Sequence, residues 1–138
     1  MVIETLTKEQ IYCMHDEALI KFGGIPGGNE YTDGKIESIL AQQYDFFGVD
    51  KYPTVFDKAA MLLYFIAKDH CFNDGNKRTA LYATTIFLDI NGYEPTFTNS
   101  QAEQFLYKIA EGKLRGIEID EYIKRISQVI SDNVQAID

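Results

Sequence analysis

The segment from Val55 to Ala67 constrains the fold of this chain more than any other part of its sequence. It follows Pro53 and Thr54, and a proline with a capping residue marks the start of a helix. Its side chains are apolar nearly all the way round, and such a helix must be surrounded by other elements. These apolar residues are Val55, Phe56, Ala59, Ala60, Met61, Leu62, Leu63, Tyr64, Phe65 and Ile66. The segment therefore predicts a central helix in an all-α bundle.

A second helix of similar character is predicted from Asn76 to Ile90, and Asn91-Gly92 ends it. Further helices are expected over residues 7–22, 34–43, 98–110 and 119–131. Two of them start with capping-box pairs, Thr7 with Gln10 and Thr98 with Gln101. The apolar face of the first helix is predicted at Ile11, Met14, Ala18, Leu19 and Phe22.

Alternating apolar residues are nowhere sustained, so no sheet is expected beyond a small hairpin in the glycine-rich loop at residues 25–34. Neither an internal repeat nor a linker divides the chain. The sequence therefore predicts one compact domain over residues 1–138, a bundle of about six helices.

Composition and charge narrow the class of protein. The formal net charge of −8 disfavours nucleic-acid binding, because phosphate backbones select surfaces rich in lysine and arginine. Cys13 and Cys71 are too few for a disulfide scaffold and are expected to be free thiols in a reducing compartment. The longest apolar run, residues 59–67, is far shorter than the roughly 20 residues that span a bilayer. With no signal sequence at its start, the chain is expected to be cytoplasmic and to bind neither membrane nor nucleic acid.

The loop between the two central helices is unusually polar for its predicted position. Residues 68–79 contain one histidine, two carboxylates, two amides and three cationic side chains. Such groups are costly next to a core unless each has a partner. Each of them alone has an ordinary structural explanation, as a turn former, a solvated pair or a structural histidine. A continuous block of them between two core helices favours a functional site.

The second half of this loop has the properties of an anion site. A helix that starts near Gly75 or Asn76 directs its free N–H groups and the positive end of its dipole into the loop. Glycine allows a phosphate to approach the backbone closely. Lys77 and Arg78 add positive charge, and the Asn76 amide can donate to a phosphate oxygen. These residues together predict a nucleotide-phosphate site.

The first half of the loop supplies the groups that a transfer reaction needs. His70 is the natural general base for a hydroxyl nucleophile, since histidine is the residue that most often fills this role. Asp74 is a hard oxygen ligand suited to Mg²⁺, which accompanies polyphosphates. Phe72 is the apolar residue that would anchor the loop in the core. The loop therefore predicts a group-transfer enzyme.

Other common motifs do not fit the spacing. A P-loop requires a glycine where Asn76 precedes Lys77, and an EF-hand counted from His70 would end on Leu81 instead of glutamate. The histidines and cysteines form no recognisable pair of zinc-ligand couples. His15, on the first helix, is expected to be structural or exposed.

The block from His70 to Arg78 resembles the signature of the Fic/Doc superfamily, and most closely its Doc (death-on-curing) branch of toxin–antitoxin toxins. The resemblance extends to residues 15–16, 22–27, 52–54 and 91–92, and so covers nearly the whole chain. It implies an α-helical fold with the active loop between the two central helices. It also implies that residues 25–34 form a flap that positions the target segment.

The same resemblance implies a role for each residue of the motif. His70 would deprotonate a serine or threonine hydroxyl of the target, Asp74 would bind Mg²⁺, and Arg78 would take part in catalysis. The residues that would grip the ATP phosphates are Asn73, Gly75, Asn76, Lys77 and Arg78. Catalysis would then consist mostly of positioning and charge neutralisation.

The superfamily divides between two reactions at this motif. Typical Fic enzymes carry Gly-Asn-Gly-Arg and transfer AMP, whereas Doc-type toxins carry Ala-Asn-Lys-Arg and transfer the γ-phosphate to a threonine of elongation factor Tu. Here Gly75 is Fic-like and Lys77 is Doc-like. The lysine fills space that an AMP-transfer pose would need, so a protein kinase toxin that inhibits translation is favoured over a protein adenylyltransferase.

Self-restraining Fic proteins carry a Ser/Thr-x-x-x-Glu-Gly/Asn motif. The closest match runs from Thr5 to Glu9, but Gln10 stands where glycine or asparagine is required. Restraint is therefore expected from a separate antitoxin protein. A catalytically silent protein that keeps the fold only for partner contact is the third hypothesis.

Overall fold

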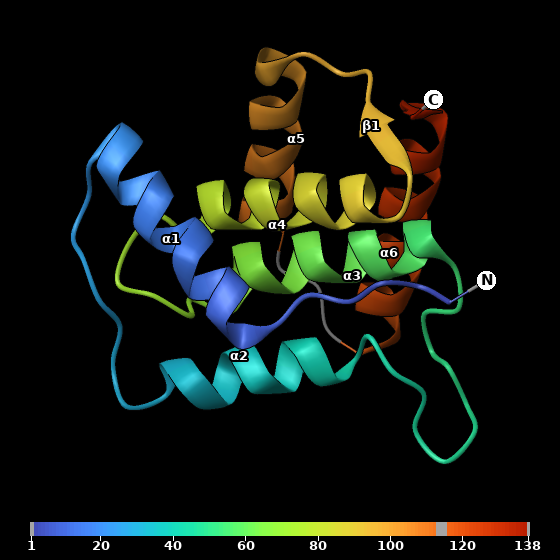
Figure 1. Ribbon diagram of the computed structural model, residues 1–138, viewed down its shortest axis with the longest axis horizontal. Coiled ribbons are helices and arrows are strands. Elements are labelled where there is room, and N and C mark those ends of the chain that lie inside the picture. Colours follow the sequence, from blue (N-terminus) through green and yellow to red (C-terminus); the bar gives the residue numbers. More distant parts are fainter. Residues whose placement is uncertain (1, 113–115, 138) are drawn as a thin grey trace.

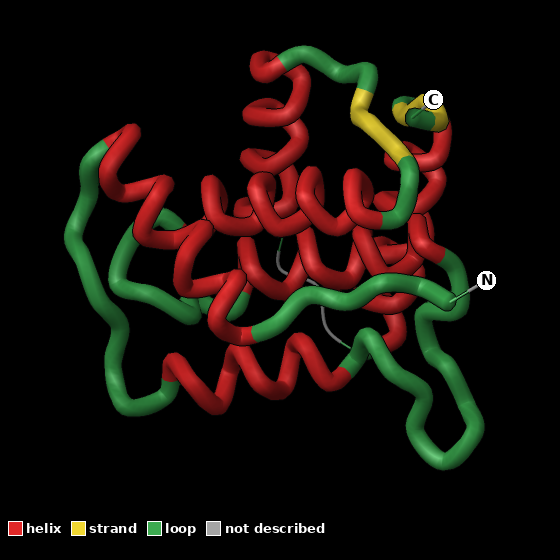
Figure 2. The backbone as a smooth tube through the Cα atoms, in the orientation of Figure 1, coloured by secondary structure: helices red, strands yellow, loops and turns green. Residues whose placement is uncertain are grey.

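The computed structural model describes residues 2–112 and 116–137, and these form six helices and one pair of short strands (Figures 1 and 2). The helices are α1 (Lys8–Phe22), α2 (Thr32–Ala41), α3 (Val55–Lys68), α4 (Asn76–Ile90), α5 (Asn99–Glu111) and α6 (Ile117–Asp132). The strands are β1 (Tyr93–Pro95) and β2 (Val134–Ala136). The prediction of an all-α bundle of about six helices is confirmed.

Helices α3 and α4 form the centre of the bundle and run side by side (Figure 1). Thr54 caps α3 as predicted, with its hydroxyl oxygen accepting from the Asp57 backbone N–H at 3.0 Å. Ten of the fourteen α3 side chains are buried, because α4, α6, α5 and α2 all pack against this helix. The apolar sequence of α3 thus places it where water is excluded on nearly every side.

Helix α1 crosses the end of α4 that begins at Asn76 (Figure 1). It starts with the predicted capping box between Thr7 and Gln10, and it buries Ile11, Met14 and Ala18. Phe22, predicted on the same inward face, is instead 47% exposed. Its ring lies against the Arg78 guanidinium, 3.7 Å from ring centroid to Cζ. The last turn of α1 therefore covers the start of α4 and not the core.

The strand pair is not where the sequence predicted a hairpin. β1 and β2 pair antiparallel, with Tyr93 opposite Ala136, and so tie the end of α4 to the end of α6. Residues 25–29 contain no strand, because backbone carbonyls of this segment accept hydrogen bonds from Asn73. The hairpin predicted within 25–34 is therefore wrong. Helix α2 also begins two residues earlier than predicted, at Thr32.

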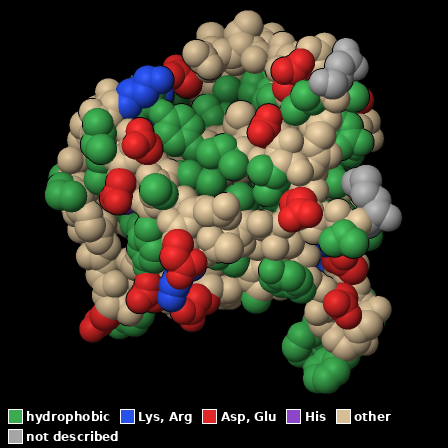
Figure 3. Space-filling model, in the orientation of Figure 1, with side chains coloured by type: hydrophobic (Ala, Val, Ile, Leu, Met, Phe, Trp, Pro, Cys, Tyr) green, Lys and Arg blue, Asp and Glu red, His purple; other side chains and the backbone are tan. Residues whose placement is uncertain are grey.

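The surface carries two apolar features. Figure 3 shows hydrophobic side chains gathered on one face of the molecule. A turn before α3 projects Phe46 and Phe47 into solvent, 76% and 91% exposed.

In residues 2–112 and 116–137, no helix is both long and apolar enough to cross a membrane.

Candidate active site

The chain between α3 and α4 is a short loop with two unusual backbone conformations. Asp69 ends α3 by donating its N–H to the Phe65 carbonyl at 2.9 Å. His70 then adopts the left-handed region with a φ of 49°, and Gly75 does so at 75° just before α4 begins. Left-handed backbone is rare in residues other than glycine and often marks a functional position. The loop thus turns sharply at His70 and again at Gly75.

Two residues in the middle of this loop anchor it in the core. Cys71 and Phe72 are 0% and 4% exposed, so the predicted anchoring role of Phe72 is confirmed. The Phe72 ring stacks on the His15 imidazole, with centroids 3.7 Å apart and planes 7° apart, and meets the Tyr12 ring edge-on. Burial raises the pKa of the Cys71 thiol to about 11, which keeps it protonated at neutral pH.

His15 is buried and structural. It is 3% exposed, and its Nε2 lies 2.8 Å from the Asp74 carbonyl oxygen, within hydrogen-bonding distance. Together with the ring stack on Phe72, this contact holds the loop at two points. Helix α1 therefore fixes the position of the loop.

Asn76 closes the loop on itself. Its side-chain oxygen accepts from the Phe72 backbone N–H, and its side-chain nitrogen donates to the Phe72 carbonyl, both at 3.0 Å. The side chain is therefore engaged with the backbone, and its main contribution to an anion is the backbone N–H at the start of α4. The first N–H groups of a helix have no intrahelical acceptor, so those of residues 76–78 are available to a phosphate.

Asp74 is an exposed carboxylate held by two backbone donors. It accepts from the N–H groups of Ile25 at 3.1 Å and Gly75 at 2.9 Å, and these bonds lower the pKa of its carboxyl below the usual value. The group is thus ionised at neutral pH and keeps lone pairs for a cation. In the part of the chain that the structure describes, no three histidine, cysteine or acidic side chains form a metal cage. One carboxylate is what Mg²⁺ needs when it is also bound by polyphosphate and water.

Asn73 attaches the 25–31 loop to the site. Its backbone N–H donates to the Gly27 carbonyl at 3.0 Å, and its side-chain nitrogen donates to the Pro26 carbonyl at 3.2 Å. Binding of phosphate by Asn73 stays a prediction. In this structure its side chain holds the neighbouring loop in place instead.

The motif residues open onto a cleft of about 460 Å³ between the start of α4 and the side of α5. Its lining residues include all seven residues predicted for the site: His70, Asn73, Asp74, Gly75, Asn76, Lys77 and Arg78. His70 is exposed at this cleft, as a base must be to reach a substrate hydroxyl.

Helix α5 adds Glu103, Leu106 and Tyr107 to the cleft, and the sequence indicated none of them. The Lys77 ammonium lies 4.8 Å from the centroid of the Tyr107 ring. Arg78 Nη2 lies 3.6 Å from Oε1 of Glu103, in a partly exposed ion pair. Both cations of the motif are thus oriented by α5 along the wall of the cleft.

The comparisons with known proteins agree with this geometry. Residues 5–88 match the model of the Fic/DOC family. The chain belongs to the Fic/DOC family. It is 26% identical over 121 residues to "Protein kinase doc" of Escherichia phage P1, which covers 88% of this chain and 94% of that protein. It is 40% identical over 94 residues to "Toxin Doc" of Mycolicibacterium smegmatis, which covers 66% of this chain and 71% of that protein.

The Fic/DOC match includes α1 to nearly the end of α4 and therefore every motif residue, but it leaves out α5. Glu103 and Tyr107 lie in that remaining part. They could not be found from the motif, because they approach it only after α5 folds against the α3–α4 pair.

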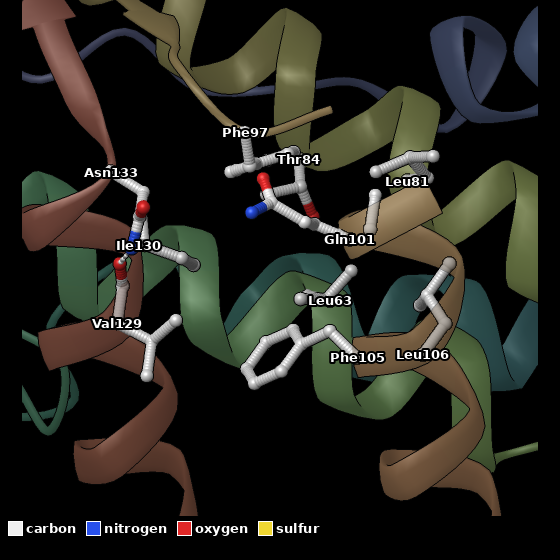
Figure 4. Close-up of a pocket in the computed structure, with 11 residues that line it drawn as sticks. Leu63, Leu81, Thr84, Phe97, Gln101, Phe105, Leu106, Val129, Ile130 and Asn133 are labelled. Atoms are coloured by element: carbon white, nitrogen blue, oxygen red, sulfur yellow. Dashed lines mark hydrogen bonds between the residues drawn. The ribbon is translucent and has the colours of Figure 1, made fainter. Parts of the chain in front are cut away.

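A second cavity lies on the other side of α5 from this Fic/DOC site. It has a volume of about 210 Å³, and Figure 4 shows its lining side chains, which come from α3, α4, α5 and α6 and, at Phe97 and Asn133, from the segments next to α5 and α6. It shares Leu81 and Leu106 with the phosphate cleft. Among the described residues that line it none is ionisable, so it is no candidate for the transfer chemistry.

Proposed function

We propose that this chain is a Doc-like toxin that transfers the γ-phosphate of Mg-ATP to a serine or threonine hydroxyl of a translation factor. Elongation factor Tu is the expected target, and the consequence would be inhibition of translation. The observation that carries the proposal is the placement of exposed His70 on the same cleft as the N-terminus of α4, Lys77 and Arg78. Phosphorylation of a hydroxyl requires a base and an anion site that open onto the same cleft.

The anion half of the site would bind the phosphates. Backbone N–H groups at the start of α4 and the two cations would neutralise charge that spreads over the phosphoryl oxygens in the transition state. Asp74, ionised and only partly engaged, would be the protein ligand of Mg²⁺. The ion would neutralise negative charge on the phosphate oxygens.

His70 would perform the proton transfer. As its imidazole takes the proton of the target hydroxyl, the hydroxyl oxygen forms a bond to the γ-phosphorus, the bond from that phosphorus to the bridging oxygen breaks, and ADP leaves. The phosphorylated side chain is the second product. No covalent enzyme intermediate is needed, so the chain supplies position and charge.

The structure supports phosphate transfer over AMP transfer at Lys77, and Gly75 does not oppose it. Lys77 lies against Tyr107 and so fills part of the cleft with a cationic side chain. Gly75, the Fic-like residue, has a φ of 75°, and a Cβ there would be 3.6 Å from His15 and Leu19, in ordinary contact. Backbone conformation thus explains the glycine, and the position does not argue for AMP transfer. The name of the phage P1 relative, "Protein kinase doc", points in the same direction.

Two forms of labelled ATP test this proposal. The protein is incubated with Mg²⁺, elongation factor Tu and ATP labelled at either the α- or the γ-phosphate. We expect γ-label on the factor and its loss in His70→Ala. Label from the α-position would establish AMP transfer instead. Transfer of neither label, with no nucleotide binding by calorimetry, would favour a silent partner-binding protein.

The partner that restrains such a toxin would be a separate antitoxin, because the self-restraining motif sought from Thr5 to Glu9 has Gln10 where glycine or asparagine is required. Co-expression with the neighbouring gene product should relieve growth inhibition caused by the chain. His70→Ala should not inhibit growth even without that product.

A further inference from the structure

Three consecutive carbonyl groups at the end of α3 are bound by two side chains of α2. Nζ of Lys35 donates to the carbonyl oxygens of Asp69 at 2.9 Å and His70 at 3.4 Å. The hydroxyl of Thr32 donates to the carbonyl oxygen of Cys71 at 2.5 Å. Thr32 and Lys35 are one turn apart, so the same face of α2 contacts residues 69–71 in order. The first turn of α2 therefore binds the backbone of the candidate base.

The backbone at His70 needs such support. Its φ of 49° lies in the left-handed region, where side chains other than glycine are disfavoured. Helices that end in this way usually have glycine at this position. A histidine persists there only if the surroundings hold it. Since the chain direction at His70 sets where the imidazole points, a change of this backbone conformation would move the base away from the cleft.

Lys35 is well suited to hold this turn. Its ammonium group lies at the C-terminal end of α3, where carbonyl groups lack helical partners and the helix dipole is negative. The neighbouring carboxyl of Asp69 is half-buried, and burial raises its pKa while Lys35 acts in the opposite direction. Lys35 is not among the residues that line the phosphate cleft, so it does not touch the nucleotide site.

We propose that Lys35 is a positioning residue for catalysis, which holds the left-handed turn at His70 through two backbone carbonyls. The inference rests on the proposed function only in taking His70 as the base. Thr32 completes the arrangement at the next carbonyl. Lys35 itself neither transfers a proton nor binds phosphate.

A series of variants tests this role. Lys35→Met removes the N–H donors and keeps much of the aliphatic side chain. Lys35→Arg supplies a guanidinium group whose N–H donors can reach both carbonyls. Lys8→Met is the matched control, because Lys8 also contacts α2, through Glu37 at 2.9 Å, but lies away from the motif loop. With labelled ATP and elongation factor Tu, we expect Lys35→Met to lower kcat about 10- to 100-fold with little change in KM for ATP. Lys35→Arg should recover most of kcat, and Lys8→Met should leave it unchanged.

Nuclear magnetic resonance gives a readout that does not depend on activity. The Cα and Cβ shifts of His70 report its backbone conformation, and we expect Lys35→Met to move them while Lys8→Met does not. If wild-type protein transfers no label but these shifts move, the proposed function fails and the positioning role stands. If a folded Lys35→Met variant keeps both the His70 shifts and kcat, the positioning role is overturned.

Should Lys35→Met fail to fold, Lys35→Gln replaces it. The amide retains donors on a shorter stem, so we expect an intermediate loss of kcat and a smaller movement of the His70 shifts. Unchanged values of both in this variant would equally overturn the inference.

Discussion

The contact between Gly24 and Asp74 predicts different effects for two neighbouring glycine substitutions. Both glycines have positive φ, 77° at Gly23 and 123° at Gly24, so alanine at either position is strained by about 1–3 kcal/mol. A Cβ at Gly23 would meet nothing within 4 Å, whereas one at Gly24 would lie 2.9 Å from Oδ2 of Asp74 and 3.0 Å from Cδ2 of Leu19. Gly24→Ala must therefore displace the carboxylate that accepts from Ile25.

We expect Gly23→Ala and Gly24→Ala to differ in both stability and Mg²⁺ dependence. Loss of the hydrogen bond from Ile25 to the displaced carboxylate adds about 1 kcal/mol of destabilisation to Gly24→Ala alone, which lowers its Tm by a few degrees more, at about 2–8 °C per kcal/mol for domains of this size range. Thermal unfolding of the two variants measures this difference. Titration of each variant with ATP, with and without Mg²⁺, measures how much Mg²⁺ increases the affinity for ATP. We expect this increase to be smaller only in Gly24→Ala. Equal Mg²⁺-dependent binding by the two variants would refute the placement of Asp74 as the metal ligand.

Three further predictions come from single contacts. Glu103→Gln removes a carboxylate 3.6 Å from Arg78, and because the pair is partly exposed we expect ATP affinity to rise only about 2- to 5-fold by calorimetry; weaker binding would contradict this. Hydrogen bonding to Asp33 raises the pKa of Tyr12 to about 12, so its stabilisation should be complete below pH 10 and lost as the pH rises towards 12; Tyr12→Phe should lack this alkaline loss in unfolding measured against pH. Phe72→Ala should cost about 3–5 kcal/mol in urea unfolding, since its ring is 4% exposed, and a cost below 1 kcal/mol would show that the loop is not anchored in the core.

The helices and the motif could be predicted because their signals are local. Thr7, Thr54 and Thr98 each cap a helix as expected, since a capping side chain bonds to a backbone N–H only three residues away. The motif is one continuous segment, so its seven residues reach the same cleft once α3 and α4 pack together. The family match over residues 5–88 includes this segment.

The supports of the motif could not be predicted, because they come from distant parts of the chain. Helical periodicity placed Phe22 with the core. Ala18 is the last buried residue of α1, however, and the Phe22 ring instead lies against the Arg78 guanidinium. Lys35 bonds to residues more than thirty positions away, and Glu103 approaches from a helix outside the family match. No local pattern distinguishes these side chains from ordinary surface residues. Their roles depend on tertiary packing.

The intact mass of elongation factor Tu, measured after incubation with Mg-ATP and this protein, tests the central claim most directly. The account predicts a gain of one phosphate on the factor, and no gain when His70→Ala replaces the wild-type chain. A gain of one AMP would move the reaction to the α-phosphate while keeping His70 as the base. A phosphate gain of the same rate with His70→Ala would contradict the account, because the exposed histidine on the cleft would then have no part in the transfer.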